Sequence, residues 1–114
     1  MSVTAYTHDP NGLLQTISRK IDKGDIASWE LKSGPESAHL HHKSKQWAGF
    51  ASFHTSSGAS WVSFYIKDVE PSANADRQYV SAVYHSDLVQ MLLAHCHEKI
   101  TNIQIAIPIF KSGK

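Results

Sequence analysis

The sequence has few of the residues on which redox, metal-thiolate and nucleotide sites depend. Only one of its 114 residues is cysteine, Cys96, so an internal disulfide framework is excluded. A zinc site built from several thiolates is excluded for the same reason. Only six residues are glycine, and none lies in a Gly-x-Gly-x-x-Gly or Walker loop. The sequence therefore predicts neither a disulfide scaffold nor a phosphate-binding loop.

Charge is scarce and evenly distributed. Charged residues make up 18% of the chain, below the roughly 25% of an average globular protein. Residues 1–45 carry six basic and five acidic groups, and residues 46–114 carry five of each. Because neither half forms a basic arm, we expect no nucleic-acid partner and no acidic membrane partner.

Long apolar runs are also missing. The longest mostly apolar stretch, residues 103–110, is too short to span a bilayer. The first residues lack the charged and apolar regions of a signal peptide. We therefore expect a cytoplasmic protein. Residues 1–114 are expected to form a single domain, because this length is typical of one domain with one core.

Two helices are predicted from capping residues and apolar spacing. The first begins at Asp9-Pro10 and ends at Lys23-Gly24, where glycine supplies a left-handed position. The second begins at Ser86-Asp87, since either residue is a good N-cap. The two apolar stripes are Leu14, Ile17 and Ile21, and Leu88, Met91 and Leu92.

The remaining periodicity predicts a sheet. Strand-like alternation occurs in residues 26–32, 46–55, 59–68, 77–84 and 103–110. In residues 59–68 the apolar face is formed by Val62, Phe64 and Ile66, which we expect to lie under the helices. Residues 36–45 are predicted to be a long polar loop with room for a short strand. The element order is α-β-β-β-β-α-β, and the four middle strands should form an antiparallel meander. The expected fold class is α+β, a two-layer sandwich with a mainly antiparallel sheet and both helices on one face.

The second face of that sheet is the first candidate site. Trp61, Tyr65 and Tyr79 would project from it among hydroxyl and charged side chains. Aromatic residues with a polar end suit a surface that is sometimes wet and sometimes covered. They form either ordinary cross-strand pairs on a solvated face or a patch that faces a partner or ligand. Stacking on a nucleic acid would need a basic surround that this face lacks.

The eight histidines raise the question of a metal. The densest run is His39-Leu40-His41-His42, where an extended chain would project His39 and His41 to one side. A structural zinc site takes four ligands, usually with cysteine among them. We therefore expect no metal and no cofactor, and we count His39 and His41 with the three aromatic residues as candidate binding residues.

No catalytic residue is predicted. Cys96 lies near the end of its helix where the dipole raises the pKa of a thiol, so we interpret it as a small core residue. His85-Ser86-Asp87 holds the three residue types of a hydrolase triad, but adjacency along the chain is not triad geometry. An enzyme is not the leading expectation.

Several segments together resemble a known group of proteins. They are Gly24-Asp25-Ile26-Ala27-Ser28-Trp29, Gln46-Trp47 with Ala51-Ser52-Phe53, and Tyr84-His85-Ser86-Asp87 leading into Met91-Leu92-Leu93-Ala94-His95. The set resembles small, uncharacterised bacterial proteins of the kind carried on mobile, integron-type gene cassettes. The resemblance covers most of the chain and implies a fold and a bacterial source, but no activity. The chain departs from the group at Ser37–His41, where a Gly-Asp-Phe-Thr-His-like segment is usual.

Three functions follow as hypotheses. The leading one is a non-enzymatic binding or assembly protein with an adaptor, immunity or antitoxin-like role. It would form a homo-oligomer or bind another protein. The alternative is a small-ligand-binding protein or small enzyme with a pocket between the aromatic face and the His39–His42 stretch. The third is a metal-responsive module.

The last predicted strand supports assembly. Ile103, Ile105, Ile107 and Ile109 would form one apolar face. Pro108 cannot donate to a ladder, which places this strand at a sheet edge or ends it there. An apolar edge is a hazard unless it is covered or paired, and a second copy would pair it about a two-fold axis. The competing possibility is a monomer in which the strand inserts beside residues 26–32.

Overall fold

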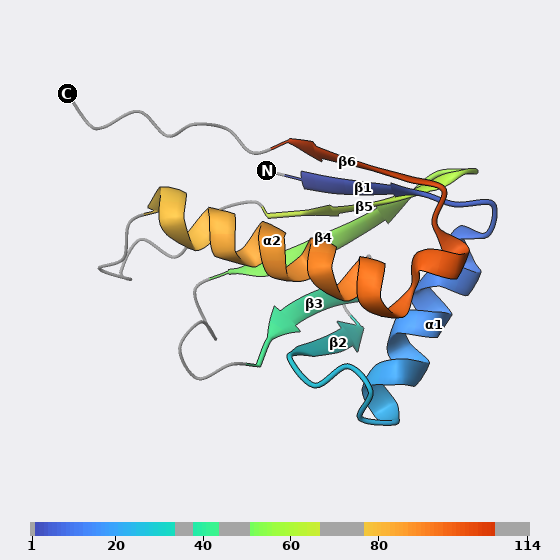
Figure 1. Cartoon of the computed structure of the whole chain (residues 1–114), viewed down its shortest axis with the longest axis horizontal. Coiled ribbons are helices and arrows are strands. Elements are labelled where there is room, and N and C mark those ends of the chain that lie inside the picture. The colour runs from blue at the N-terminus through green and yellow to red at the C-terminus, as the bar shows by residue number, and fades with distance from the viewer. Residues whose placement is uncertain (1, 34–37, 44–50, 67–76, 107–114) are drawn as a thin grey trace.

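The computed structural model describes residues 2–33, 38–43, 51–66 and 77–106 (Figure 1). These residues form six strands, two α-helices and one short 3-10 helix. In chain order the elements are β1 (Ser2–Tyr6), α1 (Pro10–Asp22), β2 (Trp29–Ser33), β3 (Ala38–His42), β4 (Ser52–Ser57), β5 (Trp61–Tyr65), α2 (Arg77–His95), η1 (His97–Lys99) and β6 (Asn102–Ala106).

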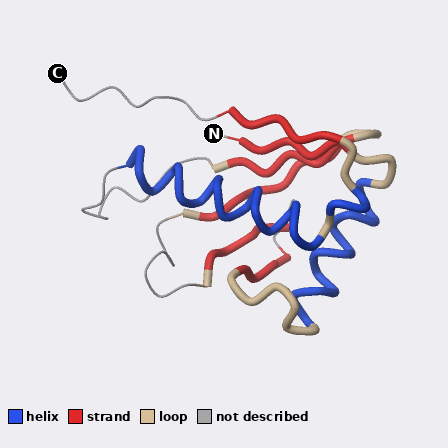
Figure 2. Tube along the Cα trace, in the orientation of Figure 1, coloured by secondary structure: helices blue, strands red, loops and turns tan. Residues whose placement is uncertain are grey.

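All six strands belong to one antiparallel sheet with the order β2-β3-β4-β5-β1-β6. The four strands β2 to β5 form a meander, as expected for consecutive strands. α2 lies over one face of the sheet, and α1 stands at the C-terminal end of α2, near β2 (Figure 2). The predicted α+β class is confirmed, and the element order roughly matches the prediction.

α1 begins and ends where its sequence predicts. The Asp9 carboxylate accepts a hydrogen bond from the Gly12 N–H at 3.0 Å, and Pro10 occupies the first turn. Gly24 follows the helix with φ +85°, a backbone conformation that favours glycine. These local signals direct the chain from α1 towards β2.

The core lies between the helices and one face of the sheet. Most of the predicted core residues are buried, while Leu14 and Ile21 are half-buried and pack against its margin. Leu13, rather than Leu14, is the fully buried residue in the first turns of α1. The confirmed core residues are Ile17, Val62, Phe64, Ile66, Leu88, Met91 and Leu92.

The prediction of a strand over residues 77–84 is wrong. α2 already begins at Arg77, so Ser86 and Asp87 lie inside the helix and cap nothing. Val80, Tyr84 and Leu88 are all buried, and this spacing of four residues continues the helical stripe. The aromatic and β-branched residues of this segment fit a strand equally well locally. Packing of the buried stripe on the sheet decides for the helix.

Two strands were not predicted as such. β1 was missed, although Val3 and Ala5 are buried and alternate with less buried neighbours. β3 occupies the centre of the predicted polar loop, because Leu40 and His42 turn into the core. As a result β6 pairs with β1 and not with the strand near residues 26–32. The predicted continuation of the last strand past Ala106, with Ile107, Pro108 and Ile109, lies outside the described residues.

Neither of the α-helices in the described part of the chain combines the length and apolarity needed to cross a bilayer.

Candidate functional site

One side of the sheet is not covered by the described helices, and we call it the open face. Its side chains are those that alternate with the buried core residues along each strand. The strand register places them in rows that run across the sheet. One row joins Trp61 to Tyr6, and the next joins Ser63 to Thr4. The open face thus has small hydroxyl side chains beside large aromatic ones.

These rows enclose a shallow hollow of about 510 Å³. Its walls and floor are uncharged: the lining residues are Thr4, Tyr6, Ser56, Trp61, Ser63 and Tyr65. Thr4 Oγ1 donates to Ser63 Oγ at 3.3 Å, and the Tyr6 hydroxyl donates to Gln104 Oε1 at 3.0 Å. Aromatic sides with hydroxyls between them suit a neutral ligand that offers both a flat apolar surface and hydrogen-bonding groups.

A row of histidines adjoins this hollow. The register places Lys32, His39, His54 and Tyr65 side by side on four neighbouring strands. His39 Nε2 lies 3.1 Å from His54 Nδ1, so one ring donates a hydrogen bond to the other. The His54 ring stacks on Tyr65 with centroids 5.5 Å apart and an interplanar angle of 24°. The two imidazoles are therefore held by neighbours on both sides.

His41 lies on the same face, one pleat along β3, with its ring 6.4 Å from that of His39. Partial burial lowers the pKa of His41, and electrostatic repulsion by Lys32 and, when it is protonated, by His39 lowers that pKa further. Glu30 opposes this shift. The neutral form of His41 is therefore favoured.

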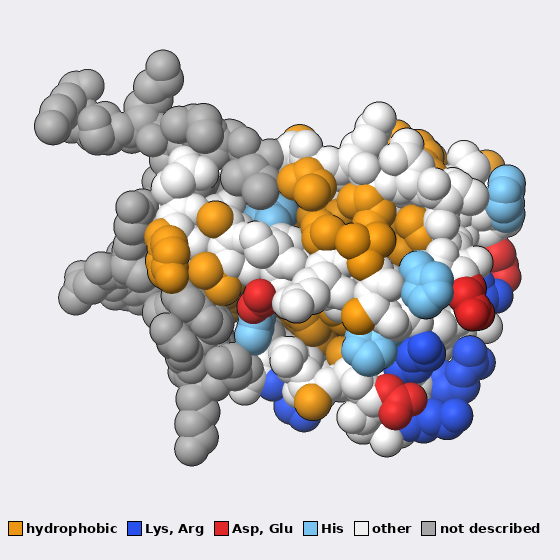
Figure 3. Space-filling model, viewed as in Figure 1, with side chains coloured by type: hydrophobic (Ala, Val, Ile, Leu, Met, Phe, Trp, Pro, Cys, Tyr) orange, Lys and Arg blue, Asp and Glu red, His pale blue; other side chains and the backbone are white. Residues whose placement is uncertain are grey.

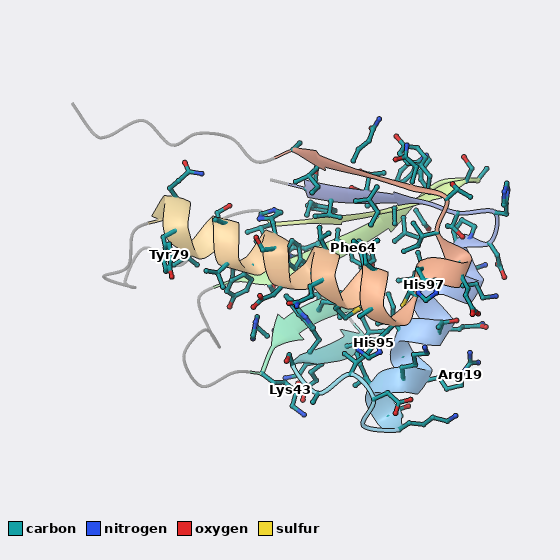
Figure 4. All side chains as sticks on the ribbon, viewed as in Figure 1. Arg19, Lys43, Phe64, Tyr79, His95 and His97 are labelled. Atoms are coloured by element: carbon teal, nitrogen blue, oxygen red, sulfur yellow. The ribbon has the colours of Figure 1, made fainter. Side chains whose placement is uncertain are left out.

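The structure brings four of the five predicted binding residues onto the open face. Trp61 and Tyr65 line the hollow, and His39 and His41 lie beside it. Tyr79 is elsewhere: it is near the N-terminal end of α2 and 59% exposed (Figure 4). Its predicted place on the sheet is wrong because residues 77–84 are helical.

Tyr6 and His54 belong to the open face but were not predicted as site residues. Tyr6 comes from β1, which was missed, although alternation with Val3 and Ala5 was the available signal. His54 lies in a predicted strand, but only the cross-strand register shows that it faces His39. Alternation along one strand cannot supply that register.

His42 points to the opposite side of the sheet from its neighbours His39 and His41. Its side chain is buried in the core, with Nε2 2.9 Å from Asp87 Oδ2 on α2. Its ring also contacts Trp29 and Tyr84. This pair ties β3 to α2, so the His42 side chain has a packing role.

The His85-Ser86-Asp87 run does not form a triad. His85 is buried and its Nδ1 lies 2.6 Å from the Ser81 carbonyl, whereas Ser86 is exposed. Asp87 contacts His42 instead, at the margin of a hollow of about 310 Å³ between α2 and residues 26–29. Consecutive helical residues point in different directions, and these three do so here.

Cys96 is a buried, free cysteine. Burial raises the pKa of its thiol, although the charge of Lys20 opposes the shift. Both its burial and its raised pKa agree with the predicted core role and disfavour nucleophilic chemistry. Across the described ranges, no three His, Cys, Asp or Glu side chains group closely enough to hold a metal ion.

The two edges of the sheet differ in charge. β2, at one edge, carries Glu30 and Lys32, whose side chains form an ion pair at 3.2 Å. β6, at the other edge, has no charged residue in its sequence NIQIA. Charged side chains are a common means of preventing edge pairing. Only the β2 edge of the described sheet is protected in this way.

An exposed apolar patch adjoins β6, and we call it the edge patch. Ile105 of β6 is 52% exposed and Leu93 of α2 is 54% exposed. With them lie Val89, Ile100 and Ile103, around a hollow of about 230 Å³. On the helix side of the molecule, hydrophobic atoms gather between α2 and β6 (Figure 3). The edge patch thus combines exposed apolar area with an uncharged edge strand.

Comparisons of the chain with protein-family models, with curated proteins and with solved structures found no match. The resemblance to cassette-borne bacterial proteins therefore stays a prediction.

Proposed function

We propose that the protein is a non-enzymatic binding and assembly protein that forms a homodimer through β6. The observation that carries the proposal is the combination of an uncharged edge strand with the adjoining edge patch. An edge strand presents a row of backbone N–H and C=O groups that can pair with another chain. The exposed apolar side chains beside it would lose contact with water on pairing.

A second copy is the occupant that best fits this edge. If two β6 strands pair antiparallel about a two-fold axis at Gln104, Ile103 of one copy lies opposite Ile105 of the other. The two-fold axis repeats this contact, so the interface holds two Ile103–Ile105 pairs. Both pairs lie on the helix side of the sheet, next to Leu93. The interface is therefore self-complementary, as a two-fold contact requires. The six described strands of one copy would then continue into those of the other as one sheet.

Light scattering in solution tests this assembly. We expect a mass of twice the chain at high concentration and a fall towards the monomer over roughly a hundredfold dilution. Ile105→Lys and Leu93→Lys should give monomers at every concentration, because each places a charge in an apolar contact. Tyr79→Lys is the control, since it also removes an exposed apolar side chain from the surface but lies away from β6.

The experiment has clear contrary outcomes. A monomer for the wild-type chain at every concentration would reject the dimer. An oligomer that Ile105→Lys and Leu93→Lys leave intact would reject β6 as the contact. Circular dichroism of each variant shows that its fold is retained, so that a loss of mass reports on the interface.

A second candidate function is ligand binding on the open face. The neutral hollow between Trp61 and Tyr65 favours it, because aromatic sides and hydroxyl groups are both present there. Backbone amide shifts in NMR spectra, recorded during titration with neutral oligosaccharides and nucleosides, test this function. Shifts at Thr4, Ser63 and Tyr65 that Trp61→Ala abolishes are the expected result. No shifts, or shifts that Trp61→Ala leaves unchanged, would contradict it.

An adaptor, immunity or antitoxin-like role belongs to the same proposal and requires another protein. Affinity capture from the native host, followed by binding measurements with the purified partner, tests that role. A partner whose binding is lost in Trp61→Ala would use the open face. A partner whose binding is lost in Ile105→Lys would use the β6 edge.

A further inference from the structure

The row of histidines on the open face contains one unusually close pair. His39 and His54 lie opposite each other on β3 and β4, with ring centroids 4.2 Å apart. Their nearest ring nitrogens, Nε2 of His39 and Nδ1 of His54, are 3.1 Å apart. Both side chains are half-buried and lie on the side of the sheet that the described helices do not cover. The pair therefore presents two nitrogen atoms at one point of the surface.

The separation of these nitrogens matches two ligands of one metal ion. With metal–nitrogen bonds of about 2.0–2.1 Å, two nitrogens 3.1 Å apart subtend an angle of about 95–102° at the metal. This angle lies between the about 90° of adjacent square-planar ligands and the about 109° of tetrahedral ligands. Because the N–H of the donor ring points at the other nitrogen, that ring must turn so that both lone pairs meet at the ion.

The protonation state of the pair also suits a metal. In a hydrogen bond between two imidazoles, one nitrogen donates and the other accepts, so at least one ring is neutral. A cation placed between the nitrogens would replace the shared proton. The Tyr65 ring, stacked on His54, holds that imidazole in its orientation. The positive charge of Lys32, next to His39, opposes a cation, but its ion pair with Glu30 reduces this effect.

We infer that His39 and His54 form an exchangeable surface site for a divalent transition metal of the Cu²⁺, Ni²⁺ and Zn²⁺ class. Neutral imidazole is a preferred ligand of these ions, and Cu²⁺ should bind most tightly. In the described ranges no group of three His, Cys, Asp or Glu side chains could hold a metal ion, so the proposed site has this pair as its ligands from those ranges. Such a site loads and releases metal without changing the fold. It is independent of the dimer contact proposed at β6.

Titration of the full chain with Cu²⁺ and with Zn²⁺ tests the site. Calorimetry gives the stoichiometry, and electron paramagnetic resonance of the Cu²⁺ form shows nitrogen ligation. We expect one site per chain that His39→Ala and His54→Ala each weaken at least tenfold. Binding should also weaken as the pH is lowered, because protons compete for the imidazoles. His97→Ala is the matched control, since it removes a histidine that is exposed but lies on η1 (Figure 4).

Other histidines of the chain can also bind Cu²⁺, so the variants decide the outcome. Equal affinities for the wild type, His39→Ala and His54→Ala would overturn the inference, as would a loss caused only by His97→Ala. Absence of any binding at pH 7.5 would overturn it too. Circular dichroism of the metal-free variants is expected to match the wild type, because both rings lie outside the core.

Discussion

Two adjacent leucines of α2 allow the packing of this fold to be tested with the same substitution at a buried and at an exposed position. Leu92 is completely buried in the core, whereas Leu93 is 54% exposed beside β6. Leu92→Ala and Leu93→Ala remove the same atoms from neighbouring positions of one helix. Both substitutions change helix propensity equally. The difference between their effects on the free energy of unfolding therefore measures burial alone.

The expected magnitudes follow from that burial. Leu92 packs in the core cluster with Phe64 and Leu88, so its truncation leaves a cavity and should cost about 2–5 kcal/mol. Leu93 loses only part of its contact with water on folding, and its truncation should cost less than about 1 kcal/mol. For a chain of this length we expect Leu92→Ala to lower the melting temperature by roughly 8–20 °C and Leu93→Ala by less than about 4 °C.

Urea unfolding followed by circular dichroism measures both values. The chain is kept at low concentration, because self-association through the edge patch would otherwise increase the effect of Leu93→Ala on the free energy of unfolding. Equal costs for the two variants, or a larger cost for Leu93→Ala, would show that the assigned face of α2 is wrong. Leu93 would then lie on the core side of α2, and Leu92 would lie on the side of the edge patch.

Three further predictions concern other elements. Gly24→Ala should cost about 1 kcal/mol or more in urea unfolding, because Gly24 has φ +85°, and an unchanged midpoint would contradict this. Cys96 should react slowly with a thiol reagent at neutral pH and rapidly in urea, since burial shields the thiol and raises its pKa; rapid reaction without urea would show otherwise. A strong chelator should leave the melting temperature unchanged, because no described group of three ligands could hold a structural metal; a fall restored by zinc would refute this.

The local parts of the fold were predictable because they depend on short-range chemistry. Asp9, Pro10 and Gly24 determine the two ends of α1 through hydrogen bonding and allowed backbone angles. Alternation placed Val62 and Phe64 in the core and left Trp61 and Tyr65 on the other face. Each of these predictions required only residues a few positions apart.

The errors arose where long-range packing decides. Residues 77–84 fit a strand as well as a helix locally, and the continuous stripe of Val80, Tyr84 and Leu88 against the sheet selects the helix. Because of that error, Tyr79 was predicted on the sheet, whereas it lies in α2. The pairing of His39 with His54 depends on the β3–β4 register, which alternation does not determine. The position of β6 beside β1 likewise became evident only from the sheet order.

In the proposed dimer, two copies of the chain pair through β6 with Ile103 opposite Ile105. Ile103→Glu and Ile105→Lys should each give a monomer. In a homodimer of either variant, both of the symmetric contacts between residues 103 and 105 would place a charged side chain against an isoleucine. Mixing the two variants should restore a dimer, since one contact then becomes a Glu–Lys pair and the other stays Ile–Ile. Light scattering of each variant and of their equimolar mixture is the direct measurement. A dimeric mass for the mixture alone is the predicted result, and a mixture that stays monomeric, or single variants that stay dimeric, would contradict it.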